Sequence, residues 1–169
     1  PIKERPKIKY MGYVDLIIYD KNTEEYTIFD IKTSTKGWSK WEKGDETKHQ
    51  QLYLYKQFYS ELFKVPLDKI NVEFYIVKRK VLSFDDENIK SPHQAYRVQN
   101  FRPTDNRKRL KKAKEDFTGF IRECYTAEGN PIDREFEKIV GKPCDWCDFG
   151  KNRELCGAAL APEEKFFSF

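Results

Sequence analysis

The chain has 169 residues and a formal net charge of +4, with 36% of its residues charged and 38% hydrophobic. This length fits one domain with its own core, and an aromatic share of 15% argues against a disordered chain, which would lack large apolar groups. No apolar run approaches the length of a membrane span, and the small positive charge favours anionic partners only weakly.

The first half of the chain predicts a β-hairpin followed by a helix. Residues 8–19 and 26–32 predict two antiparallel strands, joined at 20–24 by a turn rich in turn-forming residues. Residues 35–46 predict a loop, and apolar side chains at helical spacing predict a helix over residues 45–63.

The second half predicts two further strands and two helices. The strands are expected at 72–77 and 95–101, and the helices at 105–125 and 132–140. This order of elements predicts an α/β fold with a mixed central β-sheet flanked by helices.

Two aspartates and a lysine are placed on the predicted hairpin where they can meet. Asp30 and Lys32 are two residues apart in one strand, so they share a face of the sheet. Asp15 lies in the neighbouring strand, and a tight connection brings its carboxylate toward that of Asp30. Two carboxylates among apolar strands are costly unless a cation offsets them, and Mg²⁺ prefers such oxygen ligands. The alternative is an ion pair of Asp30 with Lys32 on a solvated sheet face.

Three short motifs follow one another along the chain. They are Gly12-Tyr13-Val14-Asp15, Asp30-Ile31-Lys32 and Gln51-Leu52-Tyr53-Leu54-Tyr55. In order and spacing they resemble the PD-(D/E)XK nuclease superfamily, and within it the RecB-like exonuclease branch with its phage and CRISPR-associated members. The resemblance covers roughly residues 8–156 and implies a restriction-endonuclease-like core. We place this core at residues 1–141 and a cysteine-containing C-terminal tail, packed on it, at 142–169.

The resemblance implies a deoxyribonuclease that depends on Mg²⁺ or Mn²⁺ and hydrolyses phosphodiester bonds, with an exonuclease acting at DNA ends as the expected type. The implied metal ligands are the carboxylates of Asp15 and Asp30 and the backbone carbonyl of Ile31. Lys32 is implied as the catalytic lysine, which positions water or stabilises the charge that develops on the phosphate.

Four further residues are expected to hold DNA. The resemblance places Gln51 and Tyr55 beside the active site, and their i, i+4 spacing puts them on one helix face. For Tyr55 ordinary core packing is the alternative, because it also lies on the apolar stripe of the helix. The hydroxyl groups of Thr33 and Ser34 can donate hydrogen bonds to phosphate oxygens.

Aromatic and basic residues elsewhere allow further contacts with nucleic acid. Trp38 and Trp41 follow Lys32 and either stack on an unpaired base at a DNA end or pack on the core as a lid. Six cations crowd the predicted helix at 105–125, where they either follow a phosphate backbone or form a solvated helix face. These cations are Arg107, Lys108, Arg109, Lys111, Lys112 and Lys114.

The resemblance also leaves a gap at the start of the chain. Members of this branch usually carry an upstream acidic helix and often a histidine before the Gly-x-x-Asp strand. Only 14 residues precede Asp15, and they contain neither. We expect either a truncated chain or a reduced site. The alternative function is therefore a catalytically reduced nuclease-fold module that binds DNA or a partner protein.

Three cysteines lie together near the C-terminus. Cys144, Cys147 and Cys156 have a spacing that suits an intracellular metal site better than a disulfide framework. A zinc ion or a 4Fe–4S cluster requires four ligands, and three are local. Cys124 is a weak candidate for the fourth because it continues an apolar helix stripe. The alternatives are a former metal site or three reduced thiols in a packed turn.

The expected partner is DNA, with a protein partner in a recombination, replication or CRISPR complex as a further expectation. No membrane association is expected. The expected location is the cytoplasm of a bacterial, archaeal or phage-infected cell.

Overall fold

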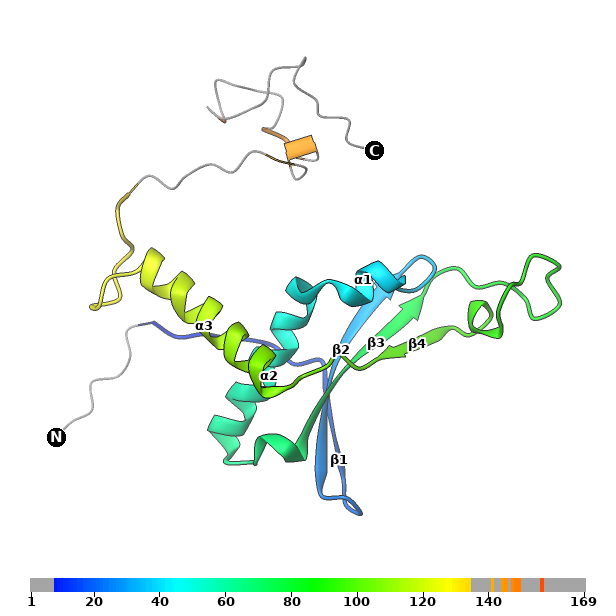
Figure 1. Ribbon diagram of the computed structural model, residues 1–169, viewed down its shortest axis with the longest axis horizontal. Helices are drawn as coiled ribbons and strands as arrows, with labels where there is room; N and C mark the ends of the chain where they lie inside the picture. Colours follow the sequence, from blue (N-terminus) through cyan, green and yellow to red (C-terminus); the bar gives the residue numbers. More distant parts are fainter. Residues whose placement is uncertain (1–7, 135–140, 142–143, 146, 150–155, 157–169) are drawn as a thin grey trace. The chain divides into compact units, whose positions relative to one another are not determined.

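The computed structural model describes residues 8–134, 141, 144–145, 147–149 and 156. Its contacts divide the chain into two units, Pro1–Pro131 and Ile132–Phe169. The strands and helices named below all belong to the first unit, where four strands form one sheet in the order β1-β2-β3-β4 (Figure 1).

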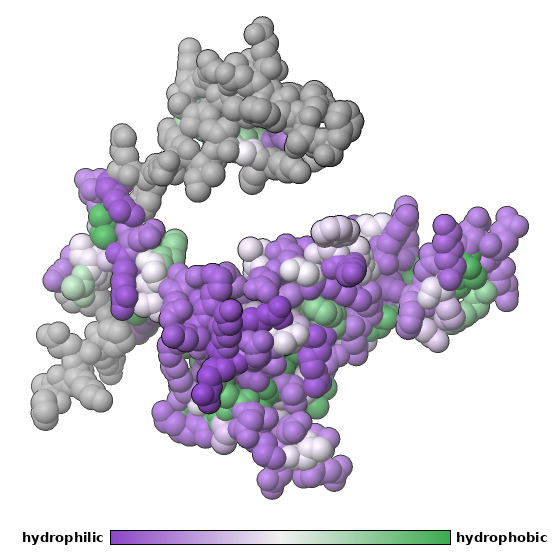
Figure 2. Space-filling model, in the orientation of Figure 1, coloured by the Kyte–Doolittle hydropathy of each residue, from purple (hydrophilic) through white to green (hydrophobic). Residues whose placement is uncertain are grey.

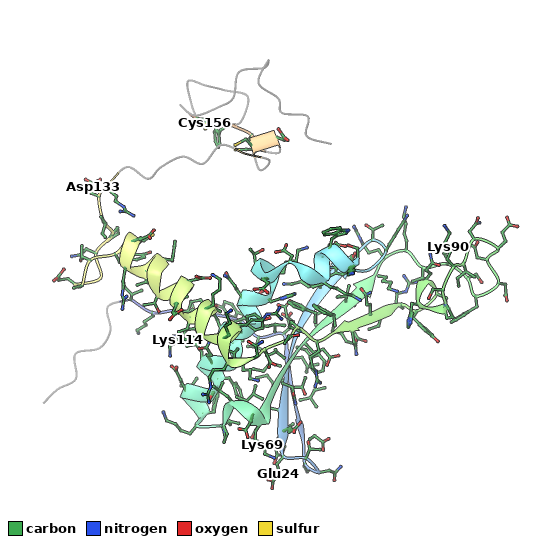
Figure 3. All side chains as sticks on the ribbon, in the orientation of Figure 1. Glu24, Lys69, Lys90, Lys114, Asp133 and Cys156 are labelled. Carbon is green, nitrogen blue, oxygen red and sulfur yellow. The ribbon has the colours of Figure 1, made fainter. Side chains whose placement is uncertain are left out.

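The predicted hairpin is confirmed. β1 (Leu16–Asp20) and β2 (Glu25–Ser34) pair antiparallel along the whole of β1. A residue outside the hairpin contacts the turn between β1 and β2: the ammonium of Lys69 donates a hydrogen bond to the carbonyl of Thr23 at 2.9 Å. Figure 3 shows Lys69 next to Glu24 at this end of the hairpin.

A helical crossover joins β2 to its other neighbour, β3 (Ile70–Lys78). It contains α1 (Lys40–Gly44), α2 (Glu46–Phe63) and the short 3₁₀ helix η1 (Leu67–Lys69). Because the crossover returns the chain to the end of the sheet where β2 began, β3 pairs with β2 in parallel.

The sheet ends with β4 (Val98–Phe101), which follows the 3₁₀ helix η2 (Pro92–Gln94) and pairs antiparallel with β3. The sheet therefore contains both parallel and antiparallel pairs, and helices flank it. The predicted α/β class with a mixed central sheet is confirmed.

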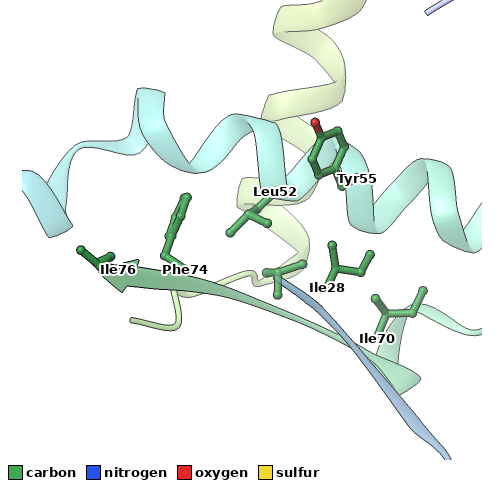
Figure 4. Packing of buried hydrophobic residues seen from close by; sticks show 7 residues of the cluster. Ile28, Leu52, Tyr55, Ile70, Phe74 and Ile76 are labelled. Carbon is green, nitrogen blue, oxygen red and sulfur yellow. The ribbon is translucent and has the colours of Figure 1, made fainter. Parts of the chain in front are cut away.

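The core lies between α2 and one face of the sheet. β3 alternates strictly between buried and half-buried residues, so every second side chain faces the helix. Figure 4 shows Leu52 of α2 pointing toward the side chains of Ile28 and Phe74, which rise from the sheet. The buried cluster consists of Ile28, Leu52, Tyr55, Ile70, Val72, Phe74 and Ile76. Full burial of one such side chain contributes about 1.5–3 kcal/mol, so this cluster fixes α2 over β2 and β3.

A second helix, α3 (Arg107–Cys124), packs on the side of α2 that faces away from the sheet. Leu110 and Ala113 of α3 form a small buried cluster with Tyr53 of α2. The amide of Gln57 donates to the Leu110 carbonyl at 2.8 Å, which adds a polar contact between the helices. The middle of α2 is therefore enclosed by the sheet on one side and by α3 on the other.

The structure corrects several predicted boundaries. The first strand begins at Leu16 rather than at residue 8, and the predicted loop at 35–46 contains the helix α1. The fourth strand is shorter than predicted, because the chain is still turning through η2 and Ala95 before Val98. Residues 132–134 have no regular secondary structure, and the rest of the helix predicted at 132–140 lies outside the described residues.

The visible surface is mostly polar, in keeping with the high charged fraction. Figure 2 shows mainly hydrophilic side chains over the sheet and helices of the first unit, with smaller apolar areas between them. No helix in the described ranges is long and apolar enough to cross a membrane.

Gly119 offers a direct test of the helix α3. An added Cβ at this position meets no heavy atom within 4 Å, and the residue lies inside a regular helix. We expect Gly119→Ala to raise the free energy of unfolding by about 1 kcal/mol, because glycine loses more backbone entropy than alanine on helix formation. Urea denaturation followed by circular dichroism measures this. An unchanged or lower stability would show that α3 is not a regular helix at Gly119.

Candidate active site

Asp30 is a buried carboxylate on the covered face of β2. It is 3% exposed, whereas its neighbour Ile31 points to the other face and is 44% exposed. The ammonium of Lys32, on the same face as Asp30, lies 2.8 Å from Asp30 Oδ2. This contact is an ion pair by distance, yet its geometry is not that of a hydrogen bond. Oδ2 accepts no hydrogen bond from any described residue.

The surroundings of Asp30 disfavour the ionised form of its carboxyl. Burial raises the pKa of the Asp30 carboxyl above its usual value, and the nearby negative charge of Asp15 raises it further. The contact with Lys32 opposes this and lowers the pKa, but the net shift is upward. Asp30 therefore holds a desolvated carboxylate oxygen that one lysine does not fully compensate.

Asp15 reaches the same place from the end of β1. Its Oδ2 accepts a hydrogen bond from the backbone N–H of Ile31 at 2.7 Å. If the β1–β2 register continued, Ile31 would lie opposite Val14, so the Asp15 side chain ends the ladder. In a strand the N–H and C=O of one residue point toward the same neighbour, so the Ile31 carbonyl also points to the side where Asp15 lies. The two carboxylates and this carbonyl, predicted from the sequence as metal ligands, are thus brought to one place.

Side chains of α2 connect this place to the segment before Asp15. The ammonium of Lys32 lies 3.5 Å from Gln51 Oε1, a long hydrogen bond. The Gln51 amide donates to the Tyr55 hydroxyl at 2.7 Å, and that hydroxyl donates to the backbone carbonyl of Tyr13 at 2.7 Å. A single chain of contacts therefore links all three sequence motifs. Tyr55 is only 7% exposed, so its observed role is to hold the segment that leads into Asp15.

Gly12 is the glycine of the first motif, and the structure gives a steric reason for it. A Cβ built on Gly12 would lie 2.7 Å from Cε1 of the Tyr55 ring. Real Cβ atoms do not approach this closely, and the ring cannot swing away without breaking the hydrogen bonds of its hydroxyl group. The absence of a side chain at residue 12 therefore lets Tyr55 pack against the backbone just before Asp15.

A pocket of about 420 Å³ opens beside Lys32 and Gln51. Thr33, predicted to hold DNA, lines it. Ser34 does not line it and instead fixes a turn, because its hydroxyl donates to the Gly37 carbonyl at 3.0 Å and accepts from the Gly37 N–H at 3.2 Å. The remaining lining residues are Trp38, Thr47 and Lys48.

The two tryptophans after β2 have different environments. Trp38 packs on the core, with its ring centroid 4.8 Å from that of Phe74, and the Lys48 ammonium lies over its ring at 5.3 Å. Trp41, on α1, is 90% exposed. Core packing is thus observed for Trp38, and base stacking stays a prediction that only Trp41 has the exposure to fulfil.

Sequence reasoning missed some residues near the site. Thr47 and Lys48 lie at the start of α2 and line the pocket without belonging to a motif. His49 is buried against Phe74 and Phe101 and belongs to no motif. Burial lowers the pKa of His49. Its spacing with Leu52 along α2 is the sequence signal that would have placed His49 on the buried stripe.

Most of the cations on α3 are engaged within the molecule. Four of the six form ion pairs, and two of these pairs connect α3 to α2. The pairs are Arg109–Glu46, Lys111–Glu115, Lys112–Asp116 and Lys114–Glu61. A continuous phosphate-binding stripe on α3 is therefore less favoured than the sequence alone indicated.

The donor atoms at Asp15, Asp30 and Ile31 fit a hard divalent cation better than a structural metal. Among the described residues no group of three or more His, Cys, Asp or Glu side chains could hold a metal ion. Mg²⁺ does not need such a group, because it binds through one or two carboxylates and keeps several waters. The buried Oδ2 of Asp30, whose charge the ion pair with Lys32 offsets only in part, is the observation that favours a cation here.

The cysteine segment belongs to the second unit and is described only in part. Cys144 and Cys156 are half-buried and Cys147 is exposed. The backbone N–H of Cys147 donates to the Cys144 carbonyl at 3.3 Å, so these two residues share a turn. Several residues around them lie outside the described part of the chain. The predicted zinc or iron–sulfur site therefore stays a prediction.

Comparison with known proteins gives one match. A family model described as the PD-(D/E)XK nuclease superfamily matches residues 6–156, which include all three motifs and the whole sheet. The mixed sheet with flanking helices is consistent with the restriction-endonuclease-like fold of that superfamily. No curated protein and no solved structure matches the chain.

Proposed function

Because this chain belongs to the PD-(D/E)XK nuclease superfamily, we propose that it is a Mg²⁺- or Mn²⁺-dependent deoxyribonuclease, an exonuclease acting at DNA ends. Membership implies nuclease activity in general, a hydrolase reaction on DNA, and superfamily members typically use divalent metals such as Mg²⁺. The observation that carries the finer proposal is the buried Oδ2 of Asp30 beside Asp15, whose charge Lys32 offsets only in part.

The proposed reaction is hydrolysis of one phosphodiester bond. Water adds to phosphorus, one P–O ester bond breaks, and the leaving oxygen takes up a proton. Asp15, Asp30 and the Ile31 carbonyl would hold a divalent cation, which would supply a positive charge to polarise the phosphate and to acidify the attacking water.

Lys32 supplies the positive charge that the protein itself brings to the reaction. Its ammonium, 2.8 Å from Asp30 Oδ2 and 3.5 Å from Gln51 Oε1, is held from two sides while its side chain is partly exposed to the pocket. A fixed cation at this position stabilises negative charge that develops on the phosphate oxygens. Gln51 and Thr33 are proposed to contact DNA directly, and Ser34 and Tyr55 to act through the backbone that they fix.

Cleavage assays on purified protein test the proposal. Linear duplex DNA and covalently closed circular DNA are incubated with Mg²⁺, with Mn²⁺ and with EDTA. We expect degradation of the linear form only, and only with metal. Cleavage of the closed circle would exclude an exonuclease. The absence of metal-dependent turnover on any DNA would overturn the proposed activity.

The finer assignments rest on the sequence resemblance. We propose membership of the RecB-like branch of phage or CRISPR-associated type, and a protein partner in a recombination, replication or CRISPR complex. A nuclease core at 1–141, a C-terminal tail at 142–169 and a cytoplasmic location belong to the same proposal.

A catalytically reduced module that binds DNA or a partner protein is the second candidate. Two observations favour it. The ammonium of Lys32 already pairs with the Asp30 carboxylate. Among the described residues, only the two acidic side chains of Asp15 and Asp30 meet at the candidate metal site. Salt-dependent DNA binding without turnover under any metal would support this candidate over the first.

A separate metal at Cys144, Cys147 and Cys156 is the remaining part of the proposal. We expect either a 4Fe–4S cluster or Zn²⁺, since paired thiolates in a Cys-x-x-Cys turn bind both. Anaerobic purification followed by elemental analysis and visible absorption distinguishes them: iron with visible absorption for the cluster, colourless protein with zinc for the other. Protein that contains neither metal would remove this part of the proposal.

A further inference from the structure

Trp41 is an exposed aromatic side chain that has no role in the proposed reaction. At 90% exposed, it is the most exposed large hydrophobic side chain in the part of the chain that the structure describes. It lies on α1, a short helix whose start is stabilised by a capping box in which Ser39 and Glu42 bond reciprocally. A solvated indole on this helix is available to bind a partner.

Trp41 does not itself line the pocket beside the candidate active site, but it lies close to that pocket along the chain. Along the chain it stands between Trp38 and Thr47, both of which line that pocket. The five-residue helix α1 spans only about 8 Å, so the indole cannot be far from the pocket wall. Figure 1 shows α1 directly beyond the end of β2, the strand that carries Asp30 and Lys32.

The charges around Trp41 match a phosphate backbone. Lys36 and Lys40 are exposed, and among the described residues neither takes part in an ion pair. Lys32 and Lys48 also line the pocket, although each is paired with an aspartate, Asp30 and Asp45 respectively. Exposed lysines that alternate with an aromatic side chain are the arrangement by which proteins bind single strands, since the cations follow phosphates and the ring stacks on a base.

We propose that Trp41 stacks on an unpaired base of the DNA strand whose backbone enters the pocket, so that the site prefers single-stranded DNA or frayed ends over blunt duplex. A paired base offers no free face to an indole, whereas an unpaired base of any identity does. This inference deepens the proposed function, because it concerns the substrate of the same site. Its test does not require turnover.

Binding of a short fluorescent oligothymidine and of a blunt duplex, both in EDTA, forms the core of the experiment. We expect Trp41→Ala to weaken oligothymidine binding about tenfold and to leave duplex binding unchanged, while Trp41→Phe keeps most of the affinity. Lys36→Gln with Lys40→Gln should make the salt dependence of binding less steep. Phe120→Ala is the matched control, because it removes another exposed aromatic side chain from a helix that does not line this pocket.

Each outcome separates the inference from the proposed function. Unchanged oligothymidine binding by Trp41→Ala overturns the inference, even if cleavage proceeds and depends on Asp30. Trp41-dependent binding without any metal-dependent cleavage supports the inference and overturns the exonuclease. A change of oligomeric state in Trp41→Ala, seen by light scattering and without a change in DNA affinity, shows that a second copy covers the indole and overturns the inference.

Discussion

Asp30→Asn is expected to abolish metal-dependent DNA cleavage, with a loss of at least about 100-fold, while the protein stays folded. The carboxylate is buried in the middle of β2, and its Oδ2 accepts no hydrogen bond from the described residues. An amide has nearly the same shape but carries no charge, so the proposed divalent cation would lose its most buried ligand. No other acidic side chain on this face of β2 can replace it.

The same substitution should not destabilise the metal-free protein at neutral pH. Burial raises the pKa of Asp30, so its charged form opposes folding above that pKa, and this cost disappears as the pH falls and the carboxyl takes up a proton. Asparagine carries no such charge. We therefore expect the free energy of unfolding of Asp30→Asn to equal or exceed that of the wild type at pH 7, with the difference shrinking toward acidic pH.

Two measurements on one preparation check this prediction. Cleavage of linear DNA gives the activity, and urea denaturation at several pH values in EDTA gives the stability. Asp20→Asn is a matched control, since Asp20 is an exposed carboxylate at the other end of β1. Full activity in Asp30→Asn would show that Asp30 is not a metal ligand. Lost activity together with lost structure would instead mark it as a structural residue.

The sequence predicts the sheet well where the pattern is local. β3 has an apolar residue at every second position from Ile70 to Ile76, and α2 carries its apolar residues at helical spacing, so both elements follow from short-range periodicity. The start of β1 does not follow from it. Residues 8–15 continue the apolar pattern, and what ends the ladder is the hydrogen bond from Ile31 to the Asp15 carboxylate, a contact between residues distant in sequence.

The candidate site, like the sheet, is predictable where the signal is local and not where it depends on contacts between residues distant in sequence. The motifs name Asp15, Asp30 and Lys32, but they do not show that Lys32 is also tied to Gln51, or that the Tyr55 hydroxyl holds the Tyr13 carbonyl. Those contacts depend on how α2 lies over β2, which is decided by core packing. The capping box of α1 was visible as Ser39 followed by Glu42, yet a helix of five residues leaves no periodic signal.

Gly12 is the position at which we expect a substitution to disturb these long-range contacts most. The backbone before Asp15 is held by the Tyr55 hydroxyl, and the Tyr55 ring occupies the space that a side chain at residue 12 would need. Alanine at this position must push the backbone and the ring apart. Because Asp15 follows closely, the displacement moves its carboxylate relative to Asp30.

We therefore expect Gly12→Ala to lower cleavage about 100-fold, as misplacement of a reacting group by about 1 Å does. Overpacking should also reduce the free energy of unfolding by about 1–3 kcal/mol, and Gly119→Ala, which meets no atom within 4 Å, is the matched control. The Tyr55→Leu background tests whether the loss of stability in Gly12→Ala comes from a clash with the Tyr55 ring or from another effect of the substitution. If the ring is the obstacle, Gly12→Ala costs less stability in the Tyr55→Leu background than in the wild type. Tyr55→Phe keeps the ring and removes only the hydroxyl, so it should lower activity without removing the clash. Equal costs of Gly12→Ala in both backgrounds would show that the first motif needs its glycine for another reason.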